Sequence, residues 1–191
     1  MTGVEALAVL FGLLCVWFCI RQNIWCWPTG LVQVTLYIYI FYDVKLYSDL
    51  ILQVVYVVLQ LYGWHQWLHG GQNRTELHLS RLESRSLAFW VVAAIAGTAV
   101  WGMVMAKYTD ASVPYWDAFT TVASLIAQWL MTRKKVESWY FWIAVDIVAI
   151  GVYAYKSLLL TSGLYMVFLV MASAGLVSWR NDFTARSESP A

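Results

Sequence analysis

Long apolar stretches separated by short polar connections dominate the chain. Five windows carry no charged residue, and two more carry a single acid each, Glu5 and Asp146. A helix needs about 20 apolar residues to cross the hydrocarbon core of a bilayer. The windows therefore predict seven membrane-spanning helices, near residues 3–20, 27–42, 46–68, 87–106, 116–132, 138–155 and 158–179. Together they use most of the chain, so no separate soluble domain is expected.

The polar connections predict the orientation in the membrane. With the N-terminus outside, nine of the twelve Lys and Arg residues fall on the inner side. Short inner loops are enriched in Lys and Arg, so we expect the N-terminus outside and the C-terminus inside. The first apolar stretch lacks the basic start and cleavage site of a signal peptide and is expected to be retained.

Composition narrows the functional classes further. Apolar residues make up 61% of the chain and charged residues 12%, with a net charge of +1, whereas soluble domains average about 25% charged residues. Nucleic-acid binding is excluded as a main activity, because it requires a clustered positive excess. Three cysteines in or beside one apolar run, Cys15, Cys19 and Cys26, make no disulfide framework and are expected to be reduced.

An internal repeat emerges when the chain is compared with itself at an offset of 112 residues. Residues 13–67 then show 11 identities with residues 125–179, including the pairs Trp17 with Trp129, Trp27 with Trp139 and Trp67 with Trp179. Chance would give roughly 0.2 Trp pairs over this length, so the first three helices and the last three are predicted to be duplicates. Because a three-helix unit ends on the side opposite its start, two parallel copies need one linker helix between them.

The expected fold is therefore an all-α integral membrane protein with two parallel three-helix repeats joined by a linker helix, a 3+1+3 arrangement. The predicted organisation is a first repeat over 1–69, a cytoplasmic loop and linker helix over 70–108, a second repeat over 109–180 and a disordered cytoplasmic tail over 181–191. Transporters built from parallel repeats bind their substrate near the midplane, at the repeat interface.

Asp146 is the polar residue that such a membrane span explains least. An acid at the centre of a spanning helix costs about 2.5 to 3.5 kcal/mol on insertion scales. Helical spacing places Trp139, Trp142 and Tyr153 on the same face as Asp146. Aromatic rings and one carboxylate form a good receptor for a planar cation. The alternative is that the tryptophans belong to the interfacial belt and that Asp146 pairs within the bundle.

Other predicted helices carry polar stripes at steps of three and four residues. A substrate path would take its polar groups from these stripes, whereas the alternative is ordinary hydrogen bonding between helices, worth about 0.6 kcal/mol each. The residues selected from these stripes are Gln33, Tyr37, Gln53, Tyr56, Gln60, Ser124 and Gln128.

Catalytic and metal-binding motifs are scarce. His65 and His69 have a ligand-capable spacing, but they lie beside tryptophans at the expected membrane boundary and are read as interfacial anchors. The chain shows no phosphate-binding glycine loop, nucleophile elbow or zinc signature. We therefore expect a protein that is not an enzyme and that uses no cofactor, metal or ATP-binding domain.

Several segments carry a family resemblance. They are residues 45–53 (KLYSDLILQ), 62–67 (YGWHQW), Trp116-Asp117 and 130–142 (LMTRKKVESWYFW). Together they resemble the PnuC-type vitamin transporters over nearly the whole chain, from about Glu5 to Trp179. The resemblance implies a SWEET-like fold and a place in the bacterial inner membrane. It also implies import of nicotinamide riboside across that membrane by facilitated diffusion, followed by trapping through a cytosolic kinase. It also implies that Trp139 and Trp142 are a substrate-contacting WxxW pair and that Gln53 is the substrate-binding glutamine.

Alternatives stay open for the identity of the substrate and for the energy source of transport. Some nicotinamide riboside carriers have Asn where Asp146 stands, and other members of the family carry thiamine, which is also cationic and ring-shaped. A proton-coupled carrier, in which Asp146 takes up a proton when the substrate leaves, is a second hypothesis. A membrane receptor without transport is a third, and association into a homo-oligomer stays open.

Overall fold

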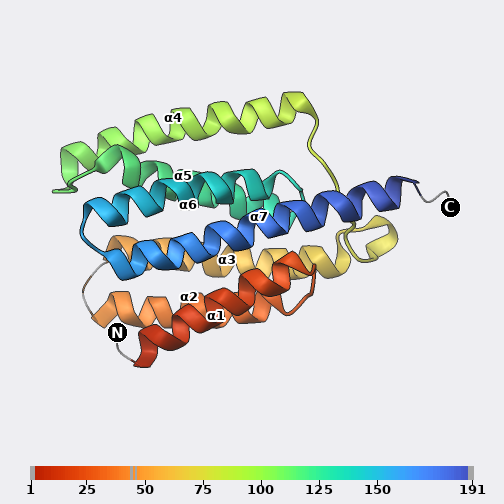
Figure 1. Cartoon of the computed structure of the whole chain (residues 1–191), viewed down its shortest axis with the longest axis horizontal. Helices are drawn as coiled ribbons and strands as arrows, with labels where there is room; N and C mark the ends of the chain where they lie inside the picture. Colours follow the sequence, from red (N-terminus) through yellow and green to blue (C-terminus); the bar gives the residue numbers. More distant parts are fainter. Residues whose placement is uncertain (1–2, 44, 46, 189–191) are drawn as a thin grey trace. The chain divides into compact units, whose positions relative to one another are not determined.

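The computed structural model describes residues 3–43, 45 and 47–188, and these form a helical protein. Seven α-helices follow one another, with a short 3-10 turn between the third and fourth (Figure 1). They are α1 (Gly3–Ile20), α2 (Cys26–Asp43), α3 (Tyr47–His69), η1 (Gln72–Arg74), α4 (Ser84–Tyr108), α5 (Pro114–Thr132), α6 (Ser138–Tyr155) and α7 (Leu159–Glu188). All seven predicted helices are found, most of them within three residues of their expected ends.

The clearest departure from the expected boundaries is at the C-terminus. The tail was expected to be disordered from residue 181, but α7 continues as a helix to Glu188. Arg, Ala and Glu are strong helix formers, so the end of the apolar run need not end the helix. Residues 189–191 lie outside the described part of the chain.

Four of the seven helices, α1, α4, α6 and α7, are long and apolar enough to cross a membrane by length and composition. The other three, α2, α3 and α5, contain most of the predicted polar stripes. That difference follows from the residues themselves, because Gln, Tyr, Thr and Ser on one face lower the apolar content of a helix without shortening it. The search for spans covers only the described residues.

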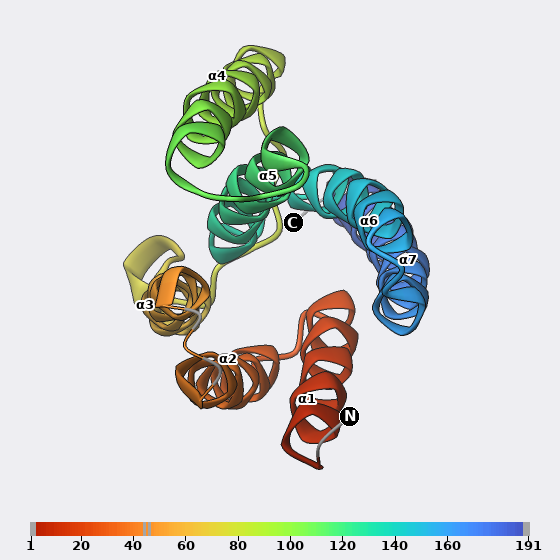
Figure 2. The same ribbon diagram turned by 90° about the vertical axis from the view of Figure 1, so that its left-hand side faces the viewer.

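The chain divides into two compact units. The first contains Met1–His78 with Thr132–Lys134, and the second contains Leu79–Met131 with Lys135–Ala191. In the first unit α2 packs against both α1 and α3 (Figure 2). In the second unit α6 packs against α7, and α4, α5 and α6 share an apolar cluster. The expected linker helix, α4, is thus part of the second unit.

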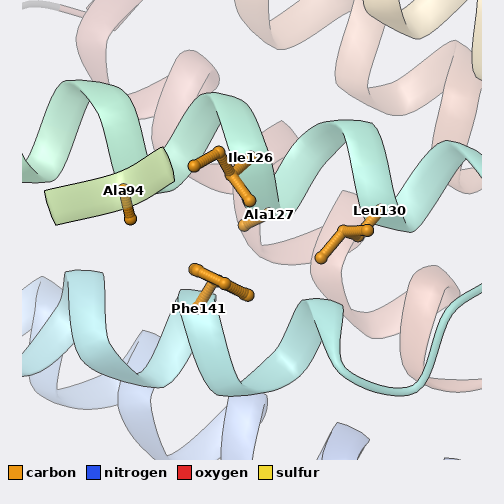
Figure 3. Packing of buried hydrophobic residues seen from close by; sticks show 5 residues of the cluster. All are labelled: Ala94, Ile126, Ala127, Leu130 and Phe141. Carbon is orange, nitrogen blue, oxygen red and sulfur yellow. The ribbon is translucent and has the colours of Figure 1, made fainter. Parts of the chain in front are cut away.

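The apolar cluster of the second unit is built from small and large side chains of three helices (Figure 3). It contains Ala94 of α4, Ile126, Ala127 and Leu130 of α5, and Phe141 of α6. Trp142 packs against this cluster from α6 and is partly buried. The cluster positions α5 beside the part of α6 that carries the predicted substrate-binding residues.

Identical local geometry recurs at the 112-residue offset. A Trp at the start of α2 and of α6 packs edge-on against a Trp in the next helix, with ring centroids 5.2 and 5.5 Å apart and interplanar angles of 86° and 88°. Each first Trp also lies over a glycine of that next helix, where an added methyl group would collide with the ring. The residues are Trp27, Trp67 and Gly63 in the first unit and Trp139, Trp179 and Gly175 in the second.

The turns that flank these helices repeat in the same way. Gln22 and Lys134 have φ angles of 53° and 48°, and Lys45 and Ser157 have φ angles of 60° and 59°. Positive φ is uncommon for residues other than glycine. The turn before α2 thus matches the turn before α6, and the turn before α3 matches the turn before α7, because the equivalent residue of each pair has a positive φ.

Two sequence features take a local role in the first unit. Pro28 falls in the first turn of α2, where a proline costs little because the N–H it lacks would have no helical partner. It is therefore part of the helix entry rather than a break. Cys15, Cys19 and Cys26 are all free thiols, as the sequence predicts.

Candidate substrate-binding site

The face of α6 that turns toward α7 carries the buried acid. Trp139 and Tyr153 both contact α7, the first through Trp179 and the second by stacking on Tyr165, with centroids 5.2 Å apart and an interplanar angle of 22°. Residues seven apart share one helical face, so Asp146 lies on the same face, midway between these two contacts. It is buried, with 4% of its surface exposed.

Asp146 has no counter-charge among the side chains that the structure describes. Its carboxyl group forms neither an ion pair nor a hydrogen bond with them, and the ion pairs found there involve other acids. Burying a carboxylate costs several kcal/mol unless a charge or hydrogen bonds compensate it. The arrangement is therefore suited to a group that supplies positive charge, either a cationic ligand or a proton.

The two tryptophans of the WxxW motif have different surroundings. Trp139 is 2% exposed, and its ring packs over Gly175 of α7. Its equivalent Trp27 packs over Gly63 of α3 in the first unit, and we call each of these two glycine positions a glycine notch. Trp142 is only partly buried and packs on the cluster of α4 to α6. The motif thus combines a ring held within the α6–α7 contact and a ring on the α5 side of the helix.

The polar residues of α5 are buried in the same unit. Ser124 is 7% and Gln128 8% exposed. The Ser124 hydroxyl donates a hydrogen bond to the carbonyl oxygen of Thr121 at 3.0 Å. Its proton is therefore used by its own helix.

Five candidate residues lie in the first unit, on α2 and α3. Gln33, Tyr37, Gln53 and Tyr56 are partly buried, while Gln60 is 6% exposed. Tyr37 stacks on Phe41 with centroids 5.6 Å apart. The amides of Gln33 and Gln60 lie against Gly12 and Gly30 respectively, where a side chain larger than hydrogen would displace them. The first unit therefore provides amides where the second provides an acid and indole rings.

Two ion pairs were not predicted from the sequence. Lys156, after α6, donates to both carboxylate oxygens of Asp117 at 3.0 Å, at the start of α5. Asp117 belongs to the Trp116-Asp117 segment of the family resemblance, and the structure pairs it with the turn that follows α6. A lysine that follows the helix by one residue was the available signal.

The second ion pair lies at the predicted inner side. Glu137 is 2% exposed, accepts a hydrogen bond from the Leu82 backbone N–H at 2.9 Å and pairs with Arg81 at 3.3 Å. The sequence signal for this ion pair was Glu137 itself, an acid two residues after the basic run of residues 133–135. It ties the turn before α6 to the segment that enters α4, both within the second unit.

The histidine pair shows no metal-site geometry. His65 and His69 are exposed, with ring centroids 5.0 Å apart, and Nδ1 of His69 lies 3.3 Å from the carbonyl oxygen of His65. In the part of the chain that the structure describes, no three metal-ligating side chains gather. The structure therefore offers no third ligand for this pair.

Comparison with known proteins connects these features to a family. The family model described as nicotinamide mononucleotide transporter matches residues 2–181. The chain belongs to this family. It is a multi-pass membrane protein of a transporter family.

Individual relatives agree with the family assignment. The chain is 28% identical to the nicotinamide riboside transporter PnuC of Escherichia coli strain K12, over 97% of this chain and 88% of that protein. It is 31% identical to the PnuC of Neisseria mucosa, over 91% of this chain and 70% of that one. The riboflavin/roseoflavin transporter RibM of Streptomyces davaonensis is 25% identical, over 89% and 81% of the two chains.

A solved structure also resembles this fold. The crystal structure of the vitamin B3 transporter PnuC superposes with a TM-score of 0.72 at 30% sequence identity, covering 93% of this chain and 80% of that one. The family that the sequence motifs predicted is thus confirmed, and the all-helical fold resembles that PnuC structure. The relatives differ in their cargo, because RibM is named for a flavin.

Proposed function

We propose that this protein imports nicotinamide riboside across the bacterial inner membrane by facilitated diffusion. The observation that carries the proposal is Asp146, a buried acid without a counter-charge between two aromatic contacts of α6 with α7. The pyridinium ring of nicotinamide riboside is planar and cationic, so it can compensate the carboxylate and stack on aromatic rings. The PnuC relatives are named as nicotinamide riboside transporters, which supports the same cargo.

In this proposal the residues divide by chemistry. Asp146 and the rings of Trp142, Trp139 and Tyr153 hold the cationic base. The polar side chains of α2, α3 and α5 meet the hydroxyl and carboxamide groups, because amides both donate and accept hydrogen bonds. These residues are Gln33, Tyr37, Gln53, Tyr56, Gln60, Ser124 and Gln128.

The same proposal includes the architecture of the carrier. Seven spanning helices in a 3+1+3 arrangement, with the N-terminus outside, would relate the two units as parallel copies. The recurring Trp–Trp–Gly contacts and turns at the 112-residue offset support this relation. Trapping of the imported cargo by a cytosolic kinase would make a passive carrier sufficient.

Uptake into proteoliposomes tests the cargo and the energetics together. Labelled nicotinamide riboside should enter vesicles that contain purified protein, without an ion gradient, and unlabelled riboside should compete. Uptake of thiamine without uptake of riboside would refute the cargo while leaving a transporter of the same family. Tight binding of riboside without any flux would refute transport itself.

A proton-coupled carrier is the second candidate, and Asp146 is the observation that favours it. A buried acid without a counter-charge can take up a proton in place of the cationic cargo. Uptake into vesicles with an imposed proton gradient should then rise and should collapse when a protonophore is added. Equal uptake with and without the gradient would exclude the coupling.

A further inference from the structure

The side-chain amide of Gln60, on α3, lies in the contact between α3 and α2. The side chain is 6% exposed and its Nε2 lies against Gly30, so closely that a methyl group on that glycine would overlap it. Its Oε1 is buried and has no hydrogen-bond partner in the described part of the chain. A buried acceptor without a partner costs about 1 to 3 kcal/mol, so this amide lowers the stability of the first unit.

The second unit shows that the helix contact does not need the amide. At the 112-residue offset, Gln60 corresponds to Ala172, which is 3% exposed, and Gly30 corresponds to Trp142. The neighbouring contacts of Trp27 with Gly63 and of Trp139 with Gly175 are nevertheless alike in the two units. A buried apolar side chain thus satisfies this position in one copy, and the amide in the other requires a different explanation.

We propose that Gln60 is a specificity-determining residue whose Oε1 accepts a hydrogen bond from the cargo. The inference rests on the proposed function, because it names a contact for that transported riboside. The donor is an N–H or O–H group, which the riboside has both in its carboxamide and in its ribose. Gly30 makes room for the amide, and the missing partner of Oε1 is supplied only when cargo is bound.

Gln60→Met tests this proposal, because Met has nearly the same length and no hydrogen-bonding group. The KM for uptake is measured for nicotinamide riboside, for the pyridine riboside that lacks the carboxamide and for the 2′-deoxyriboside. Wild-type protein should discriminate about tenfold against whichever analogue lacks the donor that Gln60 recognises. In Gln60→Met the ratio of the KM for that analogue to the KM for nicotinamide riboside should fall towards one, while the melting temperature stays equal or rises.

Gln66→Met is the matched control. Gln66 lies on the same helix, but its Nε2 already donates to the Tyr62 hydroxyl at 3.0 Å. Gln66→Met should leave unchanged the ratio of the KM for each analogue to the KM for nicotinamide riboside. If Gln60→Met also leaves both ratios unchanged, or lowers the melting temperature and uptake of all three ribosides in parallel, Gln60 is structural and the proposal is refuted.

Failure of the proposed function gives a different result. Wild-type protein would then take up no riboside, whatever residue occupies position 60. If it carries thiamine instead, the same comparison is made between thiamine and its analogue without the exocyclic amine. Loss of discrimination in Gln60→Met with that pair would support the residue's role even though the riboside assignment had failed.

Discussion

At the scale of single residues, several buried polar groups have no partner among the described residues. Asp146 has no counter-charge there, and hydrogen-bond partners are missing for Oε1 of Gln60, Oγ1 of Thr98 and Nε1 of Trp27 and Trp139. Other buried acids are paired, as Glu137 is with Arg81 and Leu82. Unsatisfied polar groups are costly in a low-dielectric interior, so their presence in a transporter points to positions that the cargo completes.

The charge of Asp146 should determine the preference for a cationic cargo. We expect Asp146→Asn to weaken competition by nicotinamide riboside about tenfold or more, because the amide offers no charge to the pyridinium ring. Its uncharged dihydro form has nearly the same shape, so competition by that form should change much less. The measurement is inhibition of labelled uptake by each compound.

Asp110→Asn provides the control for this substitution. Asp110 is exposed between α4 and α5, so its loss should change neither inhibition constant. Equal weakening of both forms in Asp146→Asn would show that the carboxylate supports the fold instead of the cationic ring.

At the scale of elements, each unit joins two helices by setting a tryptophan into a glycine notch. The contact needs both partners, since the indole gains packing area only where the neighbouring helix has no side chain in the way. Gly63 and Gly175 meet this need beneath Trp27 and Trp139. The sequence repeat predicted that these positions correspond, but not that they touch.

Gly175→Ala should destabilise the α6–α7 contact. The new Cβ would lie 2.6 Å from Cζ2 of Trp139, and overpacking of this kind costs about 1 to 3 kcal/mol. Gly163→Ala on the same helix meets nothing within 4 Å and should be neutral or stabilising by up to about 1 kcal/mol, because alanine is the better helix former. Thermal unfolding in detergent should separate the two variants, and equal melting temperatures would contradict the notch.

Glu137 connects elements through a buried carboxylate. Glu137→Ala should lower the free energy of unfolding by about 2 to 3 kcal/mol, because it leaves the Leu82 N–H without its acceptor and Arg81 without its partner. Glu83→Ala removes an exposed acid directly after Leu82 whose side chain makes no cap hydrogen bond to α4, and it should change the free energy of unfolding by less than about 0.5 kcal/mol. Denaturation of the two purified variants compares them, and similar stabilities would count against the role of this pair.

At the scale of the whole molecule, the described chain is two compact units with recurring local geometry, and the charges lie mostly between helices or near helix ends. The basic residues predict which loops face the cell interior. The loop that carries Arg74 should be inside and the loop that carries Asp110 outside.

Cysteine labelling checks this orientation. In a variant without Cys15, Cys19 and Cys26, Asp110→Cys should react with a membrane-impermeant maleimide in intact cells. Arg74→Cys should react only after the membrane is permeabilised. The reverse pattern would show that the N-terminus faces the cytoplasm.

The sequence by itself determined the number of helices, nearly all of their boundaries and the family, and it predicts an internal duplication. Apolar runs, helix periodicity and repeated tryptophans can be recognised in one sequence, because each depends only on positions along the chain. It also singled out Asp146, because an acid in an apolar span is conspicuous without any structure.

Only the tertiary structure decided which partners these residues have. Asp117 pairs with Lys156, which lies 39 residues further along the chain. Trp139 and Trp142 belong to one WxxW motif but have different neighbours. Whether a buried polar atom is satisfied depends on side chains far away in the chain. That information is absent from spacing, because helical periodicity assigns a residue to a face but not to the neighbour that the face meets.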